Sequence, residues 1–247
     1  MGLGFADDEV GAFVLCGVGL TWDMMRLGFR VRFLAVVLVS LCSAWTGFAE
    51  EEWQTLFNGK DLTGWRANVM PEAFTVVDGA IRAHAPKESA HLFFVGDEKE
   101  GFVRFRNFEF EATCRGEAGA NSGIFIHTDM TTRDAALHLA KGYEVQLNSS
   151  EKEKRKTGSL YAVVDLDKSP VDESEWFRVR IVVRDSRITV FLNDKQVVDY
   201  TEPPDVKRPA ERAGRLLDKK DGGGIAFQAH DPKSTFFFKD VRVRRLP

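Results

Sequence analysis

Apolar and polar side chains alternate along much of the chain after residue 70, which is the period of a β-strand with one buried face. The clearest case is residues 142–147 (GYEVQL). As a strand, this stretch places Tyr143, Val145 and Leu147 on one face and Glu144 and Gln146 on the other. Such a split is typical of a sheet with one face in the core and one face bordering water.

The same alternation predicts a series of short strands separated by turns. Strands are expected at residues 74–77, 80–84, 105–115, 121–127, 142–147, 157–163, 175–184, 187–192, 195–200, 222–230 and 234–246. Asp78-Gly79 and Asn193-Asp194 are turn sequences between consecutive strands. Residues 129–141 are expected to form a short helix or a long loop, residues 151–156 a solvated charged loop, and residues 201–221 a surface excursion. This succession, with no long helix, predicts an all-β fold, a β-sandwich or jelly roll.

The first 49 residues differ from the rest of the chain. Three arginines (26, 30 and 32) precede the apolar residues 33–41, and the small residues Gly47 and Ala49 follow. This order predicts a secretory signal peptide cleaved before Glu50, with Met24 or Met25 as the natural start. A retained membrane anchor is the alternative, although the apolar run is short for a bilayer. We therefore predict an N-terminal extension plus signal peptide (1–49) and one exported domain (50–247), periplasmic or extracellular and not in the membrane after cleavage.

Composition narrows the class of protein further. The chain is 44% hydrophobic and 29% charged, as in ordinary globular proteins. Its formal net charge of -3 gives no overall basic field for nucleic acid. Of the three cysteines, only Cys114 lies after residue 49, so the predicted domain cannot form an internal disulfide. Oligomeric state is open at this point.

Candidate chemistry must come from polar side chains on the strands, because the sequence contains no nucleophile elbow, phosphate loop or H-E-x-x-H motif. The residues that alternate away from the core, and that we expect to share one groove, are Glu111, His127, Glu144, Gln146, Tyr161, Gln228 and His230. Carboxylates, carboxamides and hydroxyls are the groups that recognise glycans. The spacing of the two histidines does not decide whether they are metal ligands, general acids or neither. The alternative to a binding groove is that all of these residues form the solvated face of a sheet.

Several motifs, in order along the chain, resemble the 3-keto-disaccharide hydrolase family. They are TLFNGKDLTGW (55–65), VVDGAIRA (76–83), FEFEA and GANSGIFIHT (within 108–128), GYEVQL (142–147), TGSLYAVVD (157–165), RITVFLNDKQVVDY (187–200) and GGIAFQAHD with FFKDVRVRRL (within 223–246). The resemblance covers essentially all of residues 50–247. It implies a bacterial protein with a concanavalin A-like, laminarinase-like jelly roll. This chain has His127 where the family often has Arg, and Asn148 where it often has Asp.

The resemblance also implies an activity on 3-keto-sugars. A ketone at C3 acidifies the C2 hydrogen, so a base can remove it, the C1 substituent can leave, and water can then add. The implied roles are Glu144 as base or metal ligand, His127 and His230 as acid/base groups or ligands, and Gln146, Tyr161, Gln228, Glu111 and Asn121 as substrate-binding residues. A divalent metal ion is an alternative to hydrogen-bond donors at the C3 oxygen. Two other functions stay open: a non-catalytic carbohydrate-binding module, and a retaining glycosidase with two carboxylates roughly 5 Å apart.

Overall fold

The computed structural model describes residues 52–247, so the predicted signal peptide, start site and domain boundary at residue 50 lie outside the described part and stay predictions. Within this part, the secondary structure is nearly all β, as predicted. Its helical turns are two 3-10 segments, η1 (Pro71–Ala73) and η2 (Ala210–Arg212). Over the same residues, no helix has the length and apolar character needed to cross a membrane.

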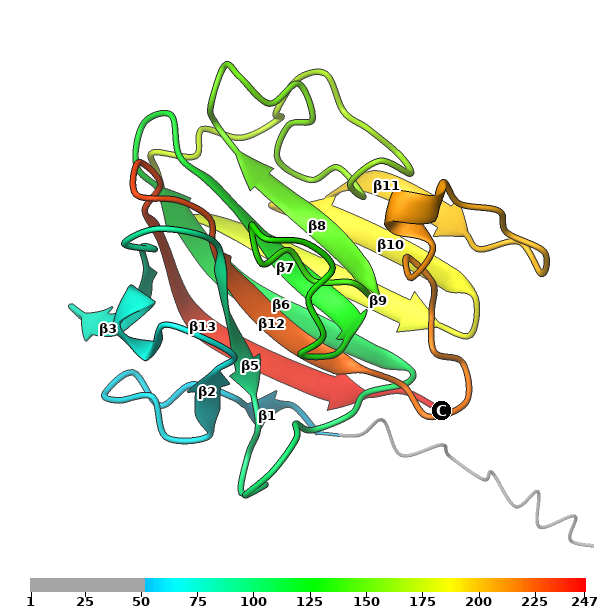
Figure 1. Cartoon of the computed structure of the whole chain (residues 1–247), viewed down its shortest axis with the longest axis horizontal. Coiled ribbons are helices and arrows are strands. Elements are labelled where there is room, and N and C mark those ends of the chain that lie inside the picture. Colours follow the sequence, from blue (N-terminus) through cyan, green and yellow to red (C-terminus); the bar gives the residue numbers. More distant parts are fainter. Residues whose placement is uncertain (1–51) are drawn as a thin grey trace, which may run out of the picture. The chain divides into compact units, whose positions relative to one another are not determined.

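The strands form two antiparallel sheets that pack face to face (Figure 1). The eight-stranded sheet has the order β11 (Lys195–Thr201), β10 (Arg187–Leu192), β9 (Phe177–Arg184), β6 (Phe108–Gly116), β13 (Phe236–Arg245), β4 (Ala80–Ala83) and β3 (Phe74–Val77), and β1 (Gln54–Thr55) also pairs with β13. The five-stranded sheet has the order β2 (Trp65–Ala67), β5 (Ala90–Phe94), β12 (Gly224–Ala229), β7 (Asn121–Thr128) and β8 (Tyr143–Asn148). The predicted β-sandwich is therefore confirmed.

Aromatic side chains from both sheets fill the space between them. Phe227 of β12 stacks on Phe238 of β13 with ring centroids 4.0 Å apart, and Trp65 stacks on the other side of Phe227 at 5.1 Å. These rings are buried, and each one removes a large apolar area from water. This aromatic core explains how a domain without a disulfide is stabilised. The free Cys114 is fully buried in the same core, as the sequence predicted.

The predicted turn residues have the backbone that tight hairpins need. Asp78 and Gly79 both have positive φ (50° and 75°), as do Asn193 and Asp194 (44° and 69°). Two consecutive positive φ values define a turn whose twist matches that of the flanking strands. The hairpins β3–β4 and β10–β11 are confirmed with these turns.

Of the two alternatives expected for residues 129–141, the structure has the loop and not the helix. Two other segments differ from the sequence prediction. Residues 157–163 are a turn and not a strand: Gly158 and Tyr161 donate backbone hydrogen bonds to the edge of β8, but Ala162 has a φ of 58° and turns the chain away. The sequence analysis assigned no strand to β5, because this strand is buried on both faces and so lacks alternation.

Candidate functional site

The outer face of the five-stranded sheet is apolar in one half and polar in the other. In the apolar half, Phe93, Phe125 and Ala226 are covered by Met130 and Leu139 of the loop 129–141. The polar half forms a pocket of about 80 Å³, lined by Asn121, Arg133, His138, Glu144, Gln146, Glu153, Tyr161, Gln228 and His230. This pocket shares Asn121, Glu153 and His230 with a wider groove of about 540 Å³. We refer to the two as the inner pocket and the outer groove.

Glu144 is a buried carboxylate in the inner pocket. It extends over Gly123 of the neighbouring strand β7, where a Cβ atom would lie 2.8 Å from its Oε1 atom, so a glycine is needed to make room. Arg215 donates a hydrogen bond to Glu144 Oε2 (3.1 Å), and both side chains are less than a tenth exposed. A guanidinium partner is what allows an ionised carboxylate to stay buried. Glu144 also lines the inner pocket.

A second buried carboxylate, Glu202, anchors the segment that carries Arg215. Glu202 Oε2 accepts hydrogen bonds from the Tyr143 hydroxyl (2.6 Å) and from the backbone N–H of Leu217 (2.8 Å). Arg208 then donates to the Tyr143 hydroxyl (2.9 Å) and to the carbonyl of Arg215 (3.2 Å). Burial and this carboxylate raise the pKa of Tyr143, so its hydroxyl keeps the proton that it donates. The segment 201–221 is thus anchored to the strand that carries Glu144 and is more than a surface excursion.

This anchored segment also contacts the loop 129–141. Arg133 donates to the carbonyl of Glu211 (2.6 Å), and the backbone N–H of Gly142 donates to the carbonyl of Gly214 (2.9 Å). The backbones approach so closely that a Cβ at Gly214 would lie 2.2 Å from the carbonyl oxygen of Ala140. The two segments that supply Arg133 and Arg215 are therefore packed together.

A chain of hydrogen bonds fixes the protonation pattern of His230. Gln146 donates to Asn121 Oδ1 (2.9 Å), so the amide nitrogen of Asn121 faces His230 Nε2 (3.1 Å). His230 Nδ1 lies 2.7 Å from Asp231 Oδ2 and donates to it. Burial would raise the pKa of the Asp231 carboxyl, but the contacts with His230 and the hydrogen bonds from Lys233 and Ser234 together hold this pKa below its usual range. His230 Nε2 is consequently an acceptor, and a basic nitrogen borders the pocket.

Tyr161 supplies a hydroxyl next to two carboxylates. It donates to Glu153 Oε2 (3.2 Å), and the guanidinium groups of Arg155 and Arg215 lie 4.7 Å and 5.0 Å from its ring centre. Burial raises the pKa of Tyr161, and the negative charges of Glu153 and Glu144 raise it further. The hydroxyl therefore keeps its proton at neutral pH and can donate it.

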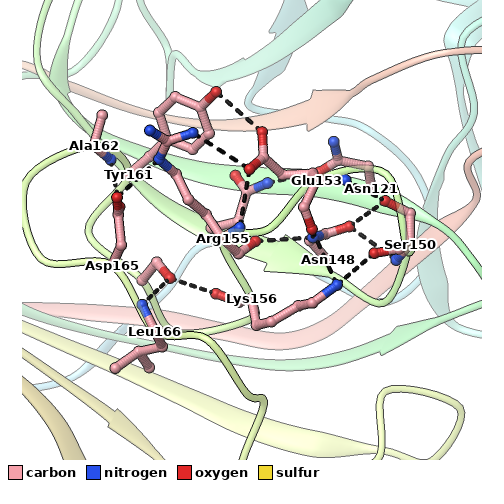
Figure 2. Close-up of polar contacts among 12 residues, drawn as sticks. Asn121, Asn148, Ser150, Glu153, Arg155, Lys156, Tyr161, Ala162, Asp165 and Leu166 are labelled. Atoms are coloured by element: carbon pink, nitrogen blue, oxygen red, sulfur yellow. Dashed lines mark hydrogen bonds and ion pairs between the residues drawn. The ribbon is translucent and has the colours of Figure 1, made fainter.

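Asn148 organises the loop that carries Glu153 (Figure 2). Its amide nitrogen donates to the carbonyls of Glu153 and Arg155 (both 2.8 Å), while its oxygen accepts from the backbone and hydroxyl of Ser150. An aspartate could not make the two donated bonds. The asparagine at this position thus has a structural reason, and residues 151–156 form the predicted loop, with Glu153, Arg155 and Lys156 partly buried.

Two buried carboxamide oxygens in the inner pocket, those of Gln146 and Gln228, have no hydrogen-bond donor among residues 52–247. The Gln228 amide nitrogen lies 3.5 Å from His91 Nε2. Burial, followed by the charges of His138 and His230, lowers the pKa of His91 to about 3, so this ring is neutral. A buried acceptor without a donor costs free energy unless a ligand supplies one. Hydroxyl groups of a sugar are suitable donors.

Six of the eight sequence-predicted site residues line the inner pocket: Asn121, Glu144, Gln146, Tyr161, Gln228 and His230. The expectation that Glu111 lies with them is wrong. Glu111 lies on the outer face of the other sheet, where it pairs with Arg242. Alternation says which residues share a face of one strand, but not which sheet the strand joins.

His127 is also misplaced by the prediction. It has a φ of 51° at the β-bulge where the register between β7 and β12 shifts. The bulge turns its ring toward the core, 6.0 Å from the Phe108 ring, and its Nε2 atom donates to the carbonyl of Arg106 (2.9 Å). Burial lowers the pKa of His127, so it is a neutral packed histidine. A bulge breaks the two-residue period on which the prediction depended.

Three lining residues that come from loops were not predicted from the sequence: Arg133, His138 and Glu153. Nor were Arg215, which contacts Glu144, and His91 of β5, which lies next to Gln228. Loops have no period, so their polar residues look like ordinary surface. The only available signal was the position of Glu153 and Arg155 beside the predicted strand at 142–147.

The arrangement of the site residues also shows whether they could bind a metal ion. Among residues 52–247, no group of three or more His, Cys, Asp or Glu side chains is arranged to hold a metal ion. The described residues therefore do not fit a metal ion bound by three such side chains.

Comparison with known proteins agrees with the fold and the motifs. Residues 52–244 match the family model of the 3-keto-alpha-glucoside-1,2-lyase-like domain. The 3-keto-disaccharide hydrolase of Bacteroides thetaiotaomicron is 25% identical over 166 residues, which cover 59% of this chain and 57% of that protein. The chain thus aligns with just over half of the length of this relative.

Two solved structures show the same sandwich. One is a crystal structure from Parabacteroides distasonis ATCC 8503 of a protein named as a glycosyl hydrolase (TM-score 0.64, 23% identity, 79% of this chain and 94% of that one). The other is the VIP36 exoplasmic/lumenal domain in its Ca²⁺/Man3GlcNAc-bound form (TM-score 0.50, 11% identity, 78% and 91%). These likenesses support the fold alone. Because the family match spans most of its length, the chain belongs to the family of 3-keto-alpha-glucoside-1,2-lyase-like domains, as its ordered motifs predicted.

Proposed function

We propose that this protein cleaves 3-keto-glycosides by elimination followed by addition of water, with hydrolysis as the net result. The observation that carries the proposal is the pairing of the buried Glu144 carboxylate with Arg215, beside a tyrosine that keeps its proton. Removing a proton from carbon needs a base, and expelling the C1 oxygen needs an acid. Family membership and the hydrolase relative support the same substrate class.

In the proposed first step, Glu144 Oε1 takes the C2 hydrogen that the C3 ketone has made acidic. The electron pair forms a C1–C2 double bond, the bond from C1 to the leaving oxygen breaks, and Tyr161 donates its proton to that oxygen. In the second step, His230 Nε2 accepts a proton from water, whose oxygen adds to C1. Glu144, after its carboxyl proton has exchanged with solvent, returns a hydrogen to C2. The proton on His230 then passes through solvent to the Tyr161 phenolate, which restores the starting state. No oxidant or reductant is consumed.

The rest of the inner pocket suits the bound sugar. Arg133 lines the pocket and is a cationic donor for the C3 oxygen as negative charge develops there. The carboxamide oxygens of Gln146 and Gln228 accept hydrogen bonds from sugar hydroxyls, which satisfies two buried acceptors. The leaving sugar or aglycone extends into the outer groove beside Glu153 and His230.

Two other functions make different demands on the site. A carbohydrate-binding module needs a free aromatic platform, but Tyr161 is the one aromatic residue that lines the inner pocket, and guanidinium groups lie near its ring. An ordinary glycosidase needs two carboxylates, and Glu144 with Glu153 supplies such a pair at the pocket wall. An ordinary glycosidase acts on the unoxidised glycoside. The substrate that is cleaved therefore distinguishes this activity from the proposed cleavage of 3-keto-glycosides.

The test compares a 3-keto-disaccharide with the same disaccharide carrying a C3 hydroxyl, using the full chain in D₂O. We expect cleavage of the keto compound alone, with deuterium incorporated at C2 of the released 3-keto-sugar. Glu144→Gln should lower kcat/KM by about 100-fold or more. The matched control is Glu111→Gln, a buried and arginine-paired carboxylate on the other sheet, which should leave kcat/KM unchanged.

Other outcomes separate the alternatives. Cleavage of the unoxidised disaccharide at a similar rate, without deuterium at C2, would support the glycosidase. Binding without product release from either sugar would support the binding module. Cleavage of the 3-keto-disaccharide at an unchanged rate by the Glu144→Gln variant, with C2 hydrogen retained, would exclude Glu144 as the base of an elimination.

We also propose export to the periplasm or the cell exterior, on the basis of the basic, apolar and small segments within residues 24–49. Expression of the full chain in a bacterium, followed by N-terminal sequencing of the periplasmic fraction, should give a protein that begins at Glu50. An uncleaved protein in the membrane fraction would support the retained anchor.

A further inference from the structure

The outer face of the eight-stranded sheet, on the side of the molecule away from the pocket, is strongly basic. Nine basic side chains project from it: Arg82, Arg115, Arg178, Arg180, Arg184, Arg187, Lys239, Arg242 and Arg244. Five acidic residues accompany them: Glu109, Glu111, Asp194, Asp199 and Asp240. This face has an excess of positive charge, although the whole chain has a formal charge of -3. We call it the basic face.

Fold stability does not account for this excess. In the hairpin β9–β10, Arg184 and Arg187 lie directly opposite one another. Like charges at such cross-strand positions destabilise a sheet. Arg82, Arg115, Arg184 and Lys239 have no ion-pair partner in the part of the chain that the structure describes, so their charges are available to an anion.

Aromatic rings hold several of these cations in place on the sheet. Trp53 lies under the guanidinium groups of Arg242 and Arg244, at 4.4 Å and 5.0 Å. Trp176 lies under the Lys239 ammonium (4.2 Å) and the Arg115 guanidinium (5.0 Å). Side chains that are already ordered lose less entropy when they bind an anion. The basic face is therefore pre-organised.

The same face contains a depression of about 480 Å³. Its charged lining residues are Arg178 and Arg242, which pair with Asp194 and Glu111, and the carboxylates Glu111 and Asp240. Asn58, Thr55 and Thr113 add neutral hydrogen-bonding groups. Guanidinium groups bind carboxylates and sulfates, and amides and hydroxyls bind sugar hydroxyls. The depression therefore suits the hydroxyl groups of a sugar unit, and the four unpaired cations of the described part of the chain, which lie outside it, are left for the acidic groups of neighbouring units.

We propose that the basic face binds an acidic polysaccharide, a polymer whose sugar units carry carboxylate or sulfate groups. Its cations are spread from β10 to β4 across strands about 4.8 Å apart, so a chain of several units is needed to contact them. Nucleic acid fits less well, because the rings that bases would stack on are covered by cations. A lipid surface fits less well, because Val77 and Leu216 are the exposed large apolar residues among residues 52–247.

The test is affinity electrophoresis of the full chain in native gels that contain polygalacturonate, dextran sulfate or neutral dextran. We expect retardation by the two acidic polymers alone, and retardation should weaken as salt increases. The double variant Arg115→Glu/Arg184→Glu should bind at least tenfold more weakly. The matched control, Lys152→Glu/Lys233→Glu, reverses two charges at the outer groove on the other sheet and should bind as the unchanged protein does.

Each other result has a stated meaning. Equal retardation by neutral dextran, or no effect of the Arg115/Arg184 variant when circular dichroism shows it folded, would overturn the proposal. Tighter binding to duplex DNA or to anionic lipid vesicles than to either acidic polymer would also overturn it. Cleavage of a soluble 3-keto-disaccharide should be unchanged in the Arg115/Arg184 variant, so the basic face and the proposed reaction can fail independently.

Discussion

Replacing Arg215 with methionine should destabilise the folded protein strongly. The substitution keeps an unbranched stem but removes the charge that pairs with Glu144 at 3.1 Å. The two side chains are 7% and 9% exposed, so the carboxylate would stay in the interior without a partner. Removing one member of a buried ion pair costs about 3–5 kcal/mol, because the remaining charge is uncompensated.

A double-mutant cycle separates the pair from its surroundings. Glu144→Gln, Arg215→Met and the combined variant are unfolded in urea, and the free energies of unfolding are compared by linear extrapolation. We expect a coupling energy of about 3 kcal/mol, because the combined variant no longer buries a lone charge. Part of the loss, about 0.5–1 kcal/mol, should remain in the combined variant, since the guanidinium also lies over the Tyr161 ring.

An exposed pair provides the control. Arg187 and Asp199 are 2.6 Å apart, but their side chains are 58% and 39% exposed. Their cycle should give about 0–1 kcal/mol, because water screens the interaction. If the Glu144–Arg215 pair gives a coupling energy no larger than this exposed pair, burial does not govern the site and the reasoning is refuted.

Three further predictions concern single residues. Gly123→Ala should lower kcat/KM at least about tenfold with little loss of fold, because its Cβ would displace Glu144 Oε1; unchanged kinetics would contradict this. As pH falls from about 6.5 toward 3, His91 becomes protonated in the unfolded chain but stays neutral in the folded chain, because burial lowers its pKa to about 3. The free energy of unfolding should therefore fall by up to about 1.4 kcal/mol per pH unit. His91→Gln should lose this part of the slope in urea titrations. Burial raises the pKa of Cys114, so peptide mapping should find this thiol alkylated at pH 8 only after denaturation.

The sheet and part of the site could be predicted because alternation is a local property of strands. It placed Glu144 and Gln146 together, and the same rule brought in Gln228 from another strand. It failed at His127, where a bulge resets the period, and at Glu111, whose strand joins the other sheet.

The remaining site residues could not be found from the sequence, because non-local contacts position them. Arg215 reaches Glu144 across 71 positions of sequence, and its place depends on hydrogen bonds from Arg208 and to Glu202 through Leu217. Glu153 depends on Asn148, whose amide holds the loop from inside. Such contacts leave no periodic trace in the chain.

The packing of residues 129–141 against 201–221 has a consequence for how substrate preference can change. Arg133 and Gly214 join the two segments through backbone carbonyls, so neither can be lengthened or exchanged without altering the contact surface of the other. Chimaeras between family members should therefore inherit both segments from one parent to remain active. We therefore expect that, among family members, sequence changes in residues 129–141 are accompanied by changes in residues 201–221, although the two segments are far apart in the gene.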